Sequence, residues 1–425
     1  MEFTKSHDVA ELNAAMAGSE VVLAGWIEDL REMGRMTFVT LRDASGRCQI
    51  IAKGEAAASL AGMTRQSVVR VSGTIQETRA RDFDFEVAAG DITLLAGAVH
   101  PLPIDPIGRL RSNIDTRLNH RALDMRDQKT AAVFKVRHRV LQSTRNQLSG
   151  RFTEITTPKI IGSASEGGAN LFSLEYFGRT AYLAQSPQLY KEQMTIGLER
   201  VFEVSSFYRA ENSHTGRHLT EFTSIDVESA FMDYTDVMDV LEALVARVCA
   251  DVAEGCAGEL ETIGHTAVVP ARPFDVVTYQ TALEELREEG VSLEFGDDLQ
   301  DAHLRILGRM HPGFFFLTDW PLKIKPFYIM EKDGEVSRSF DLQYGHLELS
   351  SGGTRLHDPA VLKSRLVEQG LDPAQFAEHL KVFGWGMPPH SGWGMGLDRL
   401  MAVLTGHDNV REVVLYPRDP DRLLP

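Results

Sequence analysis

Hydrophobic residues in the first hundred positions occur in short runs that turn-forming residues separate. Five runs are rich in β-branched or aromatic residues and predict strands over residues 21–30, 36–43, 48–53, 67–75 and 83–95. An Ala-rich segment between the third and fourth runs predicts a short helix. Five strands with one helix in this position are typical of an OB barrel, whose open face binds single-stranded nucleic acid. We therefore expect residues 1–100 to form a five-stranded OB barrel.

Helical periods dominate after residue 127. Residues 128–148 predict a helix with Phe134, Leu141 and Leu148 at heptad spacing, which fits either a layer inside one domain or a dimer seam. Further helices are expected over residues 187–198 (capped by Ser186), 236–252 and 280–310.

Strand-like runs lie between these helices, and charged residues interrupt several of them. Strands of this kind with helices segregated around them are typical of an α+β domain with a largely antiparallel sheet. Three prolines within residues 100–107 predict a stiff linker before this domain. We assign residues 101–127 to a hinge and 128–425 to the second domain.

The run over residues 201–228 carries charge where a packed strand would not. We expect Arg209 and Glu211 on its first strand, Arg217 and His218 in a polar loop, and Phe222 on the return strand. Such charges are costly unless they are paired or bind a ligand. An arginine can bond two phosphate oxygens, a carboxylate can accept from an adenine amine, and a ring can stack on a base. The hairpin is therefore a candidate floor for a nucleotide.

Two later groups agree with a nucleotide site. Glu348 and Ser351, followed by two glycines, suit a Mg²⁺ ion that keeps some waters and bridges phosphates. Gly394 and Gly396 in GWGMGLDR let the backbone approach a flat ligand, and Arg399 starts the next helix. Neither a P-loop nor the βαβ context of a dinucleotide fold accompanies them. The combination predicts a nucleotide site built on a sheet.

Composition adds limits to this picture. The chain is 43% hydrophobic and 24% charged, as in ordinary globular proteins, and its net charge of −16 argues against indiscriminate nucleic-acid binding. One basic strip, residues 109–151, holds 11 Lys/Arg against three Asp and is either a solvated helix face or a phosphate footprint. Three scattered cysteines, no membrane span and no signal-peptide pattern predict a cytoplasmic protein without membrane contact.

Taken together, these motifs resemble those of class II aminoacyl-tRNA synthetases, and of the archaeal-type aspartyl enzymes in particular. Residues 128–148 with Thr157-Pro158 match the dimer-forming first motif, FYRAENSHTGRHLTEF the second, and GWGMGLDRL the third. The resemblance covers nearly the whole chain, and the barrel matches the family's anticodon-binding domain. It implies a homodimeric ligase that activates L-aspartate with ATP and Mg²⁺ and transfers it to the 3′ end of tRNA(Asp).

The resemblance also implies a role for individual positions. Arg209 and Arg399 would be catalytic. ATP would contact Arg209, Glu211, Arg217, His218, Leu219, Phe222, Glu348, Gly396, Leu397, Asp398 and Arg399, and Mg²⁺ would bind Glu348 and Ser351. Aspartate would contact Glu166, Gln188, Leu189, Tyr190, Lys191, Arg209, Asp226, Ser351 and Arg355. The anticodon would contact Trp26, Phe38, Gln49 and Arg81, although the pattern alone fits Phe38 as barrel core and Gln49 as a surface residue.

Several features bear on the amino acid and the tRNA. Lys191 and Arg355 would pair with the aspartate side chain, and a neutral asparagine would leave both unpaired at a cost of roughly several kcal/mol. Asp226 follows the second motif as in the aspartyl enzymes, whereas Ser391 stands where the family more often has Gly. Trp26 resembles the type that charges both tRNA(Asp) and tRNA(Asn), and we expect dual specificity.

Three alternatives compete with this interpretation. They are an asparaginyl-tRNA synthetase, a tRNA-independent relative that makes asparagine, and a non-catalytic OB-fold RNA-binding protein. The N-terminal barrel argues against the second, and the set Arg209, Glu211, Glu348, Ser351 and Arg399 argues against the third. In the expected reaction the aspartate α-carboxylate attacks the ATP α-phosphorus in line, Arg209 and Mg²⁺ stabilise the charge, and no general base is evident.

Overall fold

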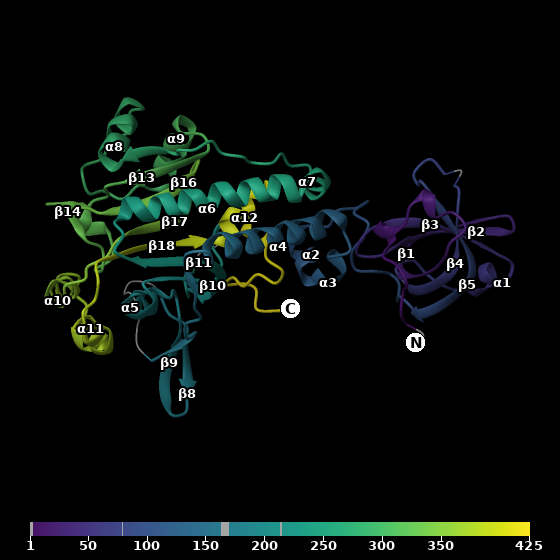
Figure 1. The fold of residues 1–425 in the computed structure, drawn as a ribbon, viewed down its shortest axis with the longest axis horizontal. Helices are drawn as coiled ribbons and strands as arrows, with labels where there is room; N and C mark the ends of the chain where they lie inside the picture. Colours follow the sequence, from purple (N-terminus) through teal and green to yellow (C-terminus); the bar gives the residue numbers. More distant parts are fainter. Residues whose placement is uncertain (1–2, 79, 163–169, 213–214) are drawn as a thin grey trace. The chain divides into compact units, whose positions relative to one another are not determined.

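The computed structural model of the chain describes residues 3–78, 80–162, 170–212 and 215–425. It divides into two compact units, Met1–Ser112 and Asn113–Pro425 (Figure 1). Residues 113–127, which we expected in a hinge, fold with the second unit as α2 (Ile114–Asn119) and α3 (Arg121–Asp124). Arg121 anchors them there, because its buried guanidinium donates to the carbonyl oxygens of Val414 and Leu415.

Over the described residues of the first unit, five strands close into a barrel in the order β1-β2-β3-β5-β4. The strands are β1 (Glu20–Met33), β2 (Met36–Arg42), β3 (Arg47–Lys53), β4 (Val68–Gln76) and β5 (Glu86–Ala96), and α1 (Gly54–Ser59) joins β3 to β4. All neighbours are antiparallel except β3 and β5, which are parallel. Alternate residues such as Leu23, Val39 and Ile50 fill the interior. The OB barrel that the hydrophobic pattern predicts is confirmed.

The second unit is built on a large mixed sheet. Among its described residues, eight strands follow the order β12-β13-β16-β17-β18-β11-β10-β6. They are β12 (Asp275–Thr278), β13 (Phe314–Thr318), β16 (Ser339–Tyr344), β17 (Leu347–Thr354), β18 (His390–Gly396), β11 (Glu221–Ala230), β10 (Arg200–Tyr208) and β6 (Thr153–Glu154). The central strands are antiparallel, and a parallel pair closes each edge. The expected α+β architecture is therefore confirmed.

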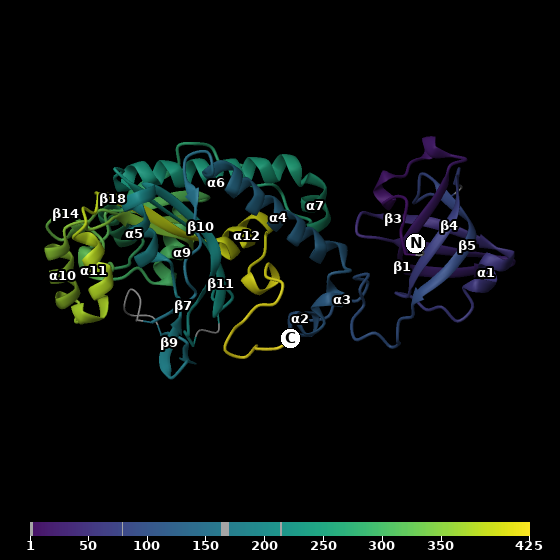
Figure 2. The same ribbon diagram turned by 60° about the horizontal axis from the view of Figure 1, so that its bottom comes forward.

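Within the described residues, three helices pack against one face of this sheet (Figure 2). These helices, α4 (Gln128–Leu148), α6 (Tyr234–Gly255) and α12 (Leu397–Thr405), share one apolar core with the sheet, to which α4 contributes Val133, Val136 and Val140. Helix α4 has the bounds that its apolar period predicts, and α6 is longer than expected at both ends. This packing fixes α12 and the ends of β11 and β18, which carry site residues.

The remaining elements surround the sheet. They are β7 (Ile160–Ile161), β8 (Ser173–Tyr176), β9 (Arg179–Leu183), α5 (Gln188–Leu198), α7 (Ala257–Ile263), α8 (Tyr279–Glu288), α9 (Asp301–Met310), β14 (Glu331–Asp333), β15 (Val336–Ser337), α10 (Pro359–Glu368) and α11 (Ala377–Phe383). Pro187, not Ser186, is the N-cap of α5, although the Ser186 hydroxyl accepts from the backbone N–H of Gln188. The acidic segment 280–310 contains two helices instead of one, because residues 289–300 are irregular.

The basic strip over residues 109–151 is largely paired within the fold. Arg117 binds Glu412, Arg137 binds Asp398, and Arg145 binds Glu154. The first two pairs connect α2 and α4 to distant parts of the same unit, so these arginines have a structural role that does not require phosphate. Within the described ranges, no helix combines the length and apolar character that crossing a bilayer demands.

Candidate active site

A cavity of about 230 Å³ lies in the second unit where β11, β17 and β18 meet. It brings together the three polar groups that the sequence singled out. The predicted residues among its lining are Gln188, Arg209, Glu211, Arg217, His218, Leu219, Phe222, Asp226, Glu348, Ser351, Arg355, Gly396, Asp398 and Arg399. Four other predicted residues are not among the described residues that line the cavity: Leu189, Tyr190, Lys191 and Leu397. Glu166 lies outside the residues that the structure describes.

The hairpin of β10 and β11 forms one wall of the cavity. Strand β10 ends at Tyr208, which pairs with Glu221, so Arg209 and Glu211 lie beyond the strand and not on it as expected. One further backbone bond, from Arg209 N–H to the Thr220 carbonyl, carries the ladder past the strand end. The Arg209 guanidinium then lies over the Phe222 ring, 5.1 Å from its centroid. Leaving the strand frees both charged side chains to face the cavity.

His218 and Arg399 meet across the cavity. Arg399 Nη2 lies 3.4 Å from His218 Nε2, and a guanidinium can only donate, so this ring nitrogen is the acceptor. The ring proton is then on Nδ1, which contacts the Thr215 hydroxyl. Burial, and next the charge of Arg399, lower the pKa of His218. Burial and the neighbouring guanidinium therefore favour the neutral form of His218.

Asp398 and Arg399, the two charged residues of the third motif, both form hydrogen bonds within the protein. Arg399, in the first turn of α12, donates from Nη1 to the Glu348 carbonyl at 2.7 Å and so joins α12 to β17. Asp398 accepts from Arg137 Nη1 at 2.6 Å and from the Thr223 N–H at 3.0 Å. Asp398 thus positions α4 and β11, and Leu397 is fully buried in the core.

A carboxylate that sequence reasoning missed lies beside Glu348 and Ser351. Asp341 on β16 is paired in register with Ser351 on β17, and its Oδ2 accepts from Lys325 Nζ at 3.0 Å. Its Oδ1 is buried and has no hydrogen-bond partner among the described residues. Burial, and then the Asp341 carboxylate, raise the pKa of Glu348. A signal was present in the sequence, because SFDLQY places one acid in an apolar strand.

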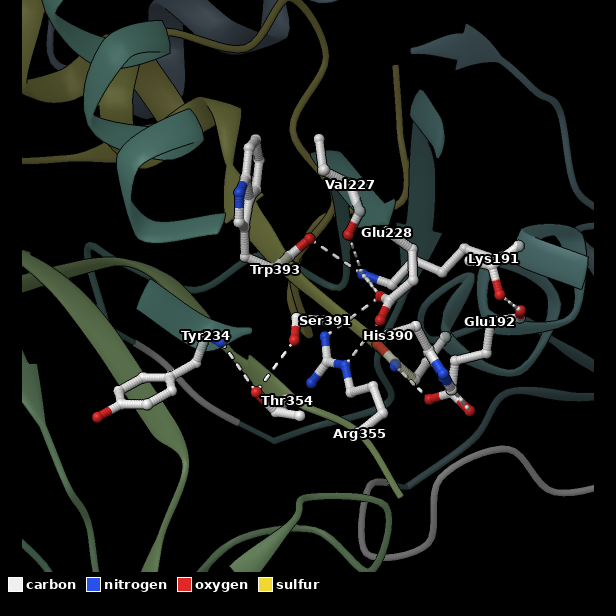
Figure 3. A network of polar contacts seen from close by, with 12 residues as sticks. Lys191, Glu192, Val227, Glu228, Tyr234, Thr354, Arg355, His390, Ser391 and Trp393 are labelled. Carbon is white, nitrogen blue, oxygen red and sulfur yellow. Dashed lines mark hydrogen bonds and ion pairs between the residues drawn. The ribbon is translucent and has the colours of Figure 1, made fainter. Parts of the chain in front are cut away.

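The opposite end of the cavity contains buried ion pairs (Figure 3). Arg355 donates from Nε and Nη2 to the two oxygens of Glu228, at 3.0 and 3.3 Å. Lys191 Nζ lies 3.1 Å from Asp226 Oδ1 and 3.4 Å from Glu228 Oε2, and it also donates to the Trp393 carbonyl. Arg355 and Asp226 line the cavity, whereas Lys191 lies behind them. Glu228, which joins the two cations, was not predicted.

Three of the expected anticodon residues share one outer face of the barrel. Trp26 pairs with Arg42, Phe38 with Ile51, and Gln49 with Thr40, so all three side chains project to the same side of β1, β2 and β3. Each is half-buried. Glu86 accepts from Gln49 Nε2 at 2.8 Å and thereby orients the amide.

The other contacts of this face involve arginines. The Arg42 guanidinium lies 5.5 Å from the centroid of the Trp26 ring. Arg81 is exposed in the loop before β5. The face therefore combines aromatic rings, an oriented amide and cations, which is the chemistry of a single-stranded nucleic-acid site.

Comparisons with known proteins agree with this arrangement. The family of tRNA synthetases class II (D, K and N) matches residues 113–420, and the OB-fold nucleic acid binding domain matches residues 21–95. Aspartate–tRNA(Asp/Asn) ligase of Methanothermobacter thermautotrophicus is 43% identical and covers 100% of this chain and 99% of the relative. The corresponding ligase of Saccharolobus solfataricus is also 43% identical, with 99% and 100% covered.

Solved structures show the same fold over the full length. Asparaginyl-tRNA synthetase of Pyrococcus horikoshii, complexed with asparaginyl-adenylate, has a TM-score of 0.92 at 31% identity and covers 100% of both chains. A putative aspartyl-tRNA synthetase of Leishmania major Friedlin has a TM-score of 0.89 at 30% identity and covers 97% of this chain and 92% of its own. With its OB barrel and its cavity on a mixed sheet, this chain belongs to the class II tRNA synthetases of the D, K and N group.

Proposed function

We propose that the protein is an aspartate–tRNA ligase that activates L-aspartate with ATP and charges both tRNA(Asp) and tRNA(Asn). One observation carries the proposal: a buried arginine, Arg355, faces the cavity with its carboxylate partner Glu228 behind it. A guanidinium held in this way suits a carboxylate ligand and not a neutral amide. Relatives that are 39–44% identical over nearly the full length carry the name aspartate–tRNA(Asp/Asn) ligase.

ATP occupies the end of the cavity formed by the hairpin and α12. We assign the α-phosphate to Arg209, the terminal phosphates to Arg217 and His218, and the adenine amine to Glu211. Phe222 and Arg399 offer flat faces on which the adenine ring can stack. Because phosphoryl-type chemistry depends on positioning and charge stabilisation, these residues suffice without a general base.

The carboxylates on the neighbouring strands β16 and β17 fit Mg²⁺. Mg²⁺ prefers hard oxygen ligands, and three are available here: the unpartnered Asp341 oxygen, the neighbouring Glu348 carboxylate and the Ser351 hydroxyl. Few protein ligands are expected, because Mg²⁺ keeps several waters and also binds phosphate oxygens. When bound, Mg²⁺ neutralises phosphate charge. Asp341, Glu348 and Ser351 would hold it, and Lys325 keeps Asp341 in place.

Aspartate occupies the opposite end. Since Nε and Nη2 of Arg355 bind Glu228, we assign Nη1 to the side-chain carboxylate of the substrate. Asp226, oriented by Ser224 and Lys191, accepts from the α-amino group together with Gln188. Lys191 acts through these carboxylates and not by direct contact, which revises the role that the resemblance implied.

The barrel face formed by Trp26, Phe38 and Gln49 reads the anticodon, with Arg81 nearby. Phe38 and Trp26 stack on bases, and Glu86 fixes the amide of Gln49 so that it presents one hydrogen-bonding edge. The two tRNAs differ at the third anticodon base. We propose that Trp26, with the Arg42 guanidinium over its ring, accepts either base at this position. We assign charging to a homodimer in the cytoplasm. Light scattering of the purified protein can test whether it is a dimer.

Charging of tRNA transcripts tests the proposal. The purified protein should attach radiolabelled aspartate to tRNA(Asp) and tRNA(Asn) transcripts at comparable rates and should not attach asparagine. Charging of tRNA(Asp) alone would remove the dual specificity. Attachment of asparagine would favour an asparaginyl enzyme, and tRNA-independent formation of asparagine would favour the synthetase-like alternative.

A further inference from the structure

A second layer of charge lies behind the proposed aspartate site. We call Glu192, His379 and His390 the Glu192 cluster; all three are buried, and they come from α5, α11 and β18. Glu192 Oε2 lies 3.3 Å from His379 Nε2 and 3.8 Å from His390 Nε2. None of the predicted ligand contacts includes these residues, and the reaction as described does not use them.

The cluster touches both walls of the site. Gln188, which lines the cavity, donates from Nε2 to Glu192 Oε1 at 2.5 Å. The backbone N–H of Arg355 donates to the His390 carbonyl at 2.9 Å. The cluster therefore contacts the side chain of Gln188 and the backbone of Arg355, the two residues that we assign to opposite ends of the aspartate.

Hydrogen-bond partners define the ring protons. His390 Nδ1 lies 2.8 Å from the Pro388 carbonyl, which can only accept, so this nitrogen carries a proton. The amide nitrogen of Gln193 lies 3.1 Å from His379 Nδ1 and can only donate, so His379 is neutral with its proton on Nε2. Only a second proton on His390 Nε2 can then provide a cation for Glu192 within the cluster.

Burial alone would lower the pKa of His390, but the Glu192 carboxylate beside it outweighs burial and raises the pKa. Burial likewise opposes ionisation of Glu192, yet His379 and His390 hold the pKa of Glu192 far below its usual value. An imidazolium next to a carboxylate is the state that these neighbours favour.

The surrounding charges determine whether the second ring proton of His390 is needed to balance Glu192. Lys191 and Arg355 are balanced by Asp226 and Glu228, so they leave the charge of Glu192 uncompensated. If His390 were neutral, the buried layer would carry a net negative charge. That layer would repel an aspartate side chain and would leave asparagine unaffected.

We propose that His390 is a specificity-determining positioning residue, whose positive charge cancels that of Glu192 so that the site behind Arg355 accepts aspartate in preference to asparagine. The proposal rests on the proposed aspartate activation. It concerns a residue that acts through Glu192 and Arg355 and does not touch the substrate.

A charge-rescue experiment tests it by aspartate-dependent and asparagine-dependent ATP–pyrophosphate exchange. His390→Gln should raise the KM for aspartate about 10- to 100-fold, with little change in the KM for ATP or for asparagine. The double variant Glu192→Gln/His390→Gln removes one charge of each sign and should return the KM for aspartate to within about threefold of the original protein. His379→Gln, a neutral-for-neutral change, is the matched control and should leave the aspartate-to-asparagine ratio within about threefold.

The pH profile provides a second measurement if His390→Gln does not fold. A raised pKa means that the charge is present at low pH and lost as pH rises through it, so the KM for aspartate should rise on the alkaline side. The double variant should lack this rise. The other groups facing His390 are His379, Glu228, Arg355 and Lys191, and the double variant retains all of them.

Two results would overturn the proposal. Equal changes for aspartate and asparagine in His390→Gln, or a double variant no better than the single one, would show that His390 acts by packing alone. Absence of aspartate-dependent exchange in the unmodified protein would instead overturn the proposed function, so the two failures are distinguishable.

Discussion

The two ends of the cavity differ in how deeply their cations are buried. At the end assigned to ATP, Arg217 pairs with Asp301 and Arg399 lies near Glu348, but their side chains keep 26% and 25% of their surface exposed, and Arg209 is exposed. At the aspartate end, Lys191 and Arg355 keep 2% and 3% and are fixed by carboxylates. A triphosphate brings several charges and can recruit solvated arginines, whereas one carboxylate must be distinguished from one amide. We therefore expect the buried end to provide selectivity and the exposed end to provide electrostatic stabilisation of the reaction.

The largest effect is expected from the exposed end. Arg209→Ala should reduce aspartate-dependent pyrophosphate exchange by about 10³-fold or more, because it removes the charge assigned to the α-phosphate. Arg287→Ala, an exposed arginine on α8, is the control and should retain full exchange. Activity of Arg209→Ala within about threefold of the unmodified protein would contradict the division between the two ends.

A different signature is expected from the buried end. Lys191→Met leaves Asp226 and Glu228 without their shared cation, so kcat/KM for aspartate should fall about 100-fold and the free energy of unfolding by about 3–5 kcal/mol. The KM for ATP should change little. Exchange kinetics together with urea unfolding measure both; an unchanged stability would mean that Lys191 is not held as the structure places it.

The proposed metal site uses Asp341 as well as Glu348 and Ser351. Asp341→Asn should raise the Mg²⁺ concentration needed for half-maximal exchange about tenfold, because one carboxylate becomes a weaker amide ligand. A Mg²⁺ titration at fixed ATP and aspartate checks this. If the half-maximal concentration is the same in both proteins, Asp341 has no part in the metal site.

The smallest effect on activation is expected from the barrel. Phe38→Ala should leave pyrophosphate exchange unchanged and raise the KM for tRNA(Asp) about tenfold, since loss of one stacking partner costs about 1–3 kcal/mol. Charging assays over a range of tRNA concentrations measure this. Phe3→Ala, which removes an exposed ring outside the barrel core, is the control; equal effects of the two changes would argue against a stacking role.

Much of the fold follows from local patterns in the sequence. The bounds of α4 follow from its 3.6-residue apolar period, and the barrel follows from alternation within five short runs. That Arg209, Glu211 and Phe222 line a common cavity was also predictable, because charged residues within a strand-like run are costly unless they are paired or face a ligand.

The buried charge layers were less accessible from the sequence. Glu228 contacts Arg355 across 127 positions, and His379 reaches Glu192 from a helix far along the chain. Each residue alone resembles an ordinary polar position, and only the packing of distant strands and helices brings them together. The end of β10 at Tyr208 was missed for the same reason, since pairing with β11 and not local propensity determines it.

If buried ion pairs adapt the aspartate end to an anionic ligand, the unmodified protein should strongly prefer aspartate to asparagine. The ratio of kcat/KM for aspartate to that for asparagine should be obtained from pyrophosphate exchange of the purified protein at saturating ATP. The buried Arg355–Glu228 and Lys191–Asp226 pairs predict a ratio of at least about 10³ in favour of aspartate. A ratio near one, or a preference for asparagine, would contradict the account.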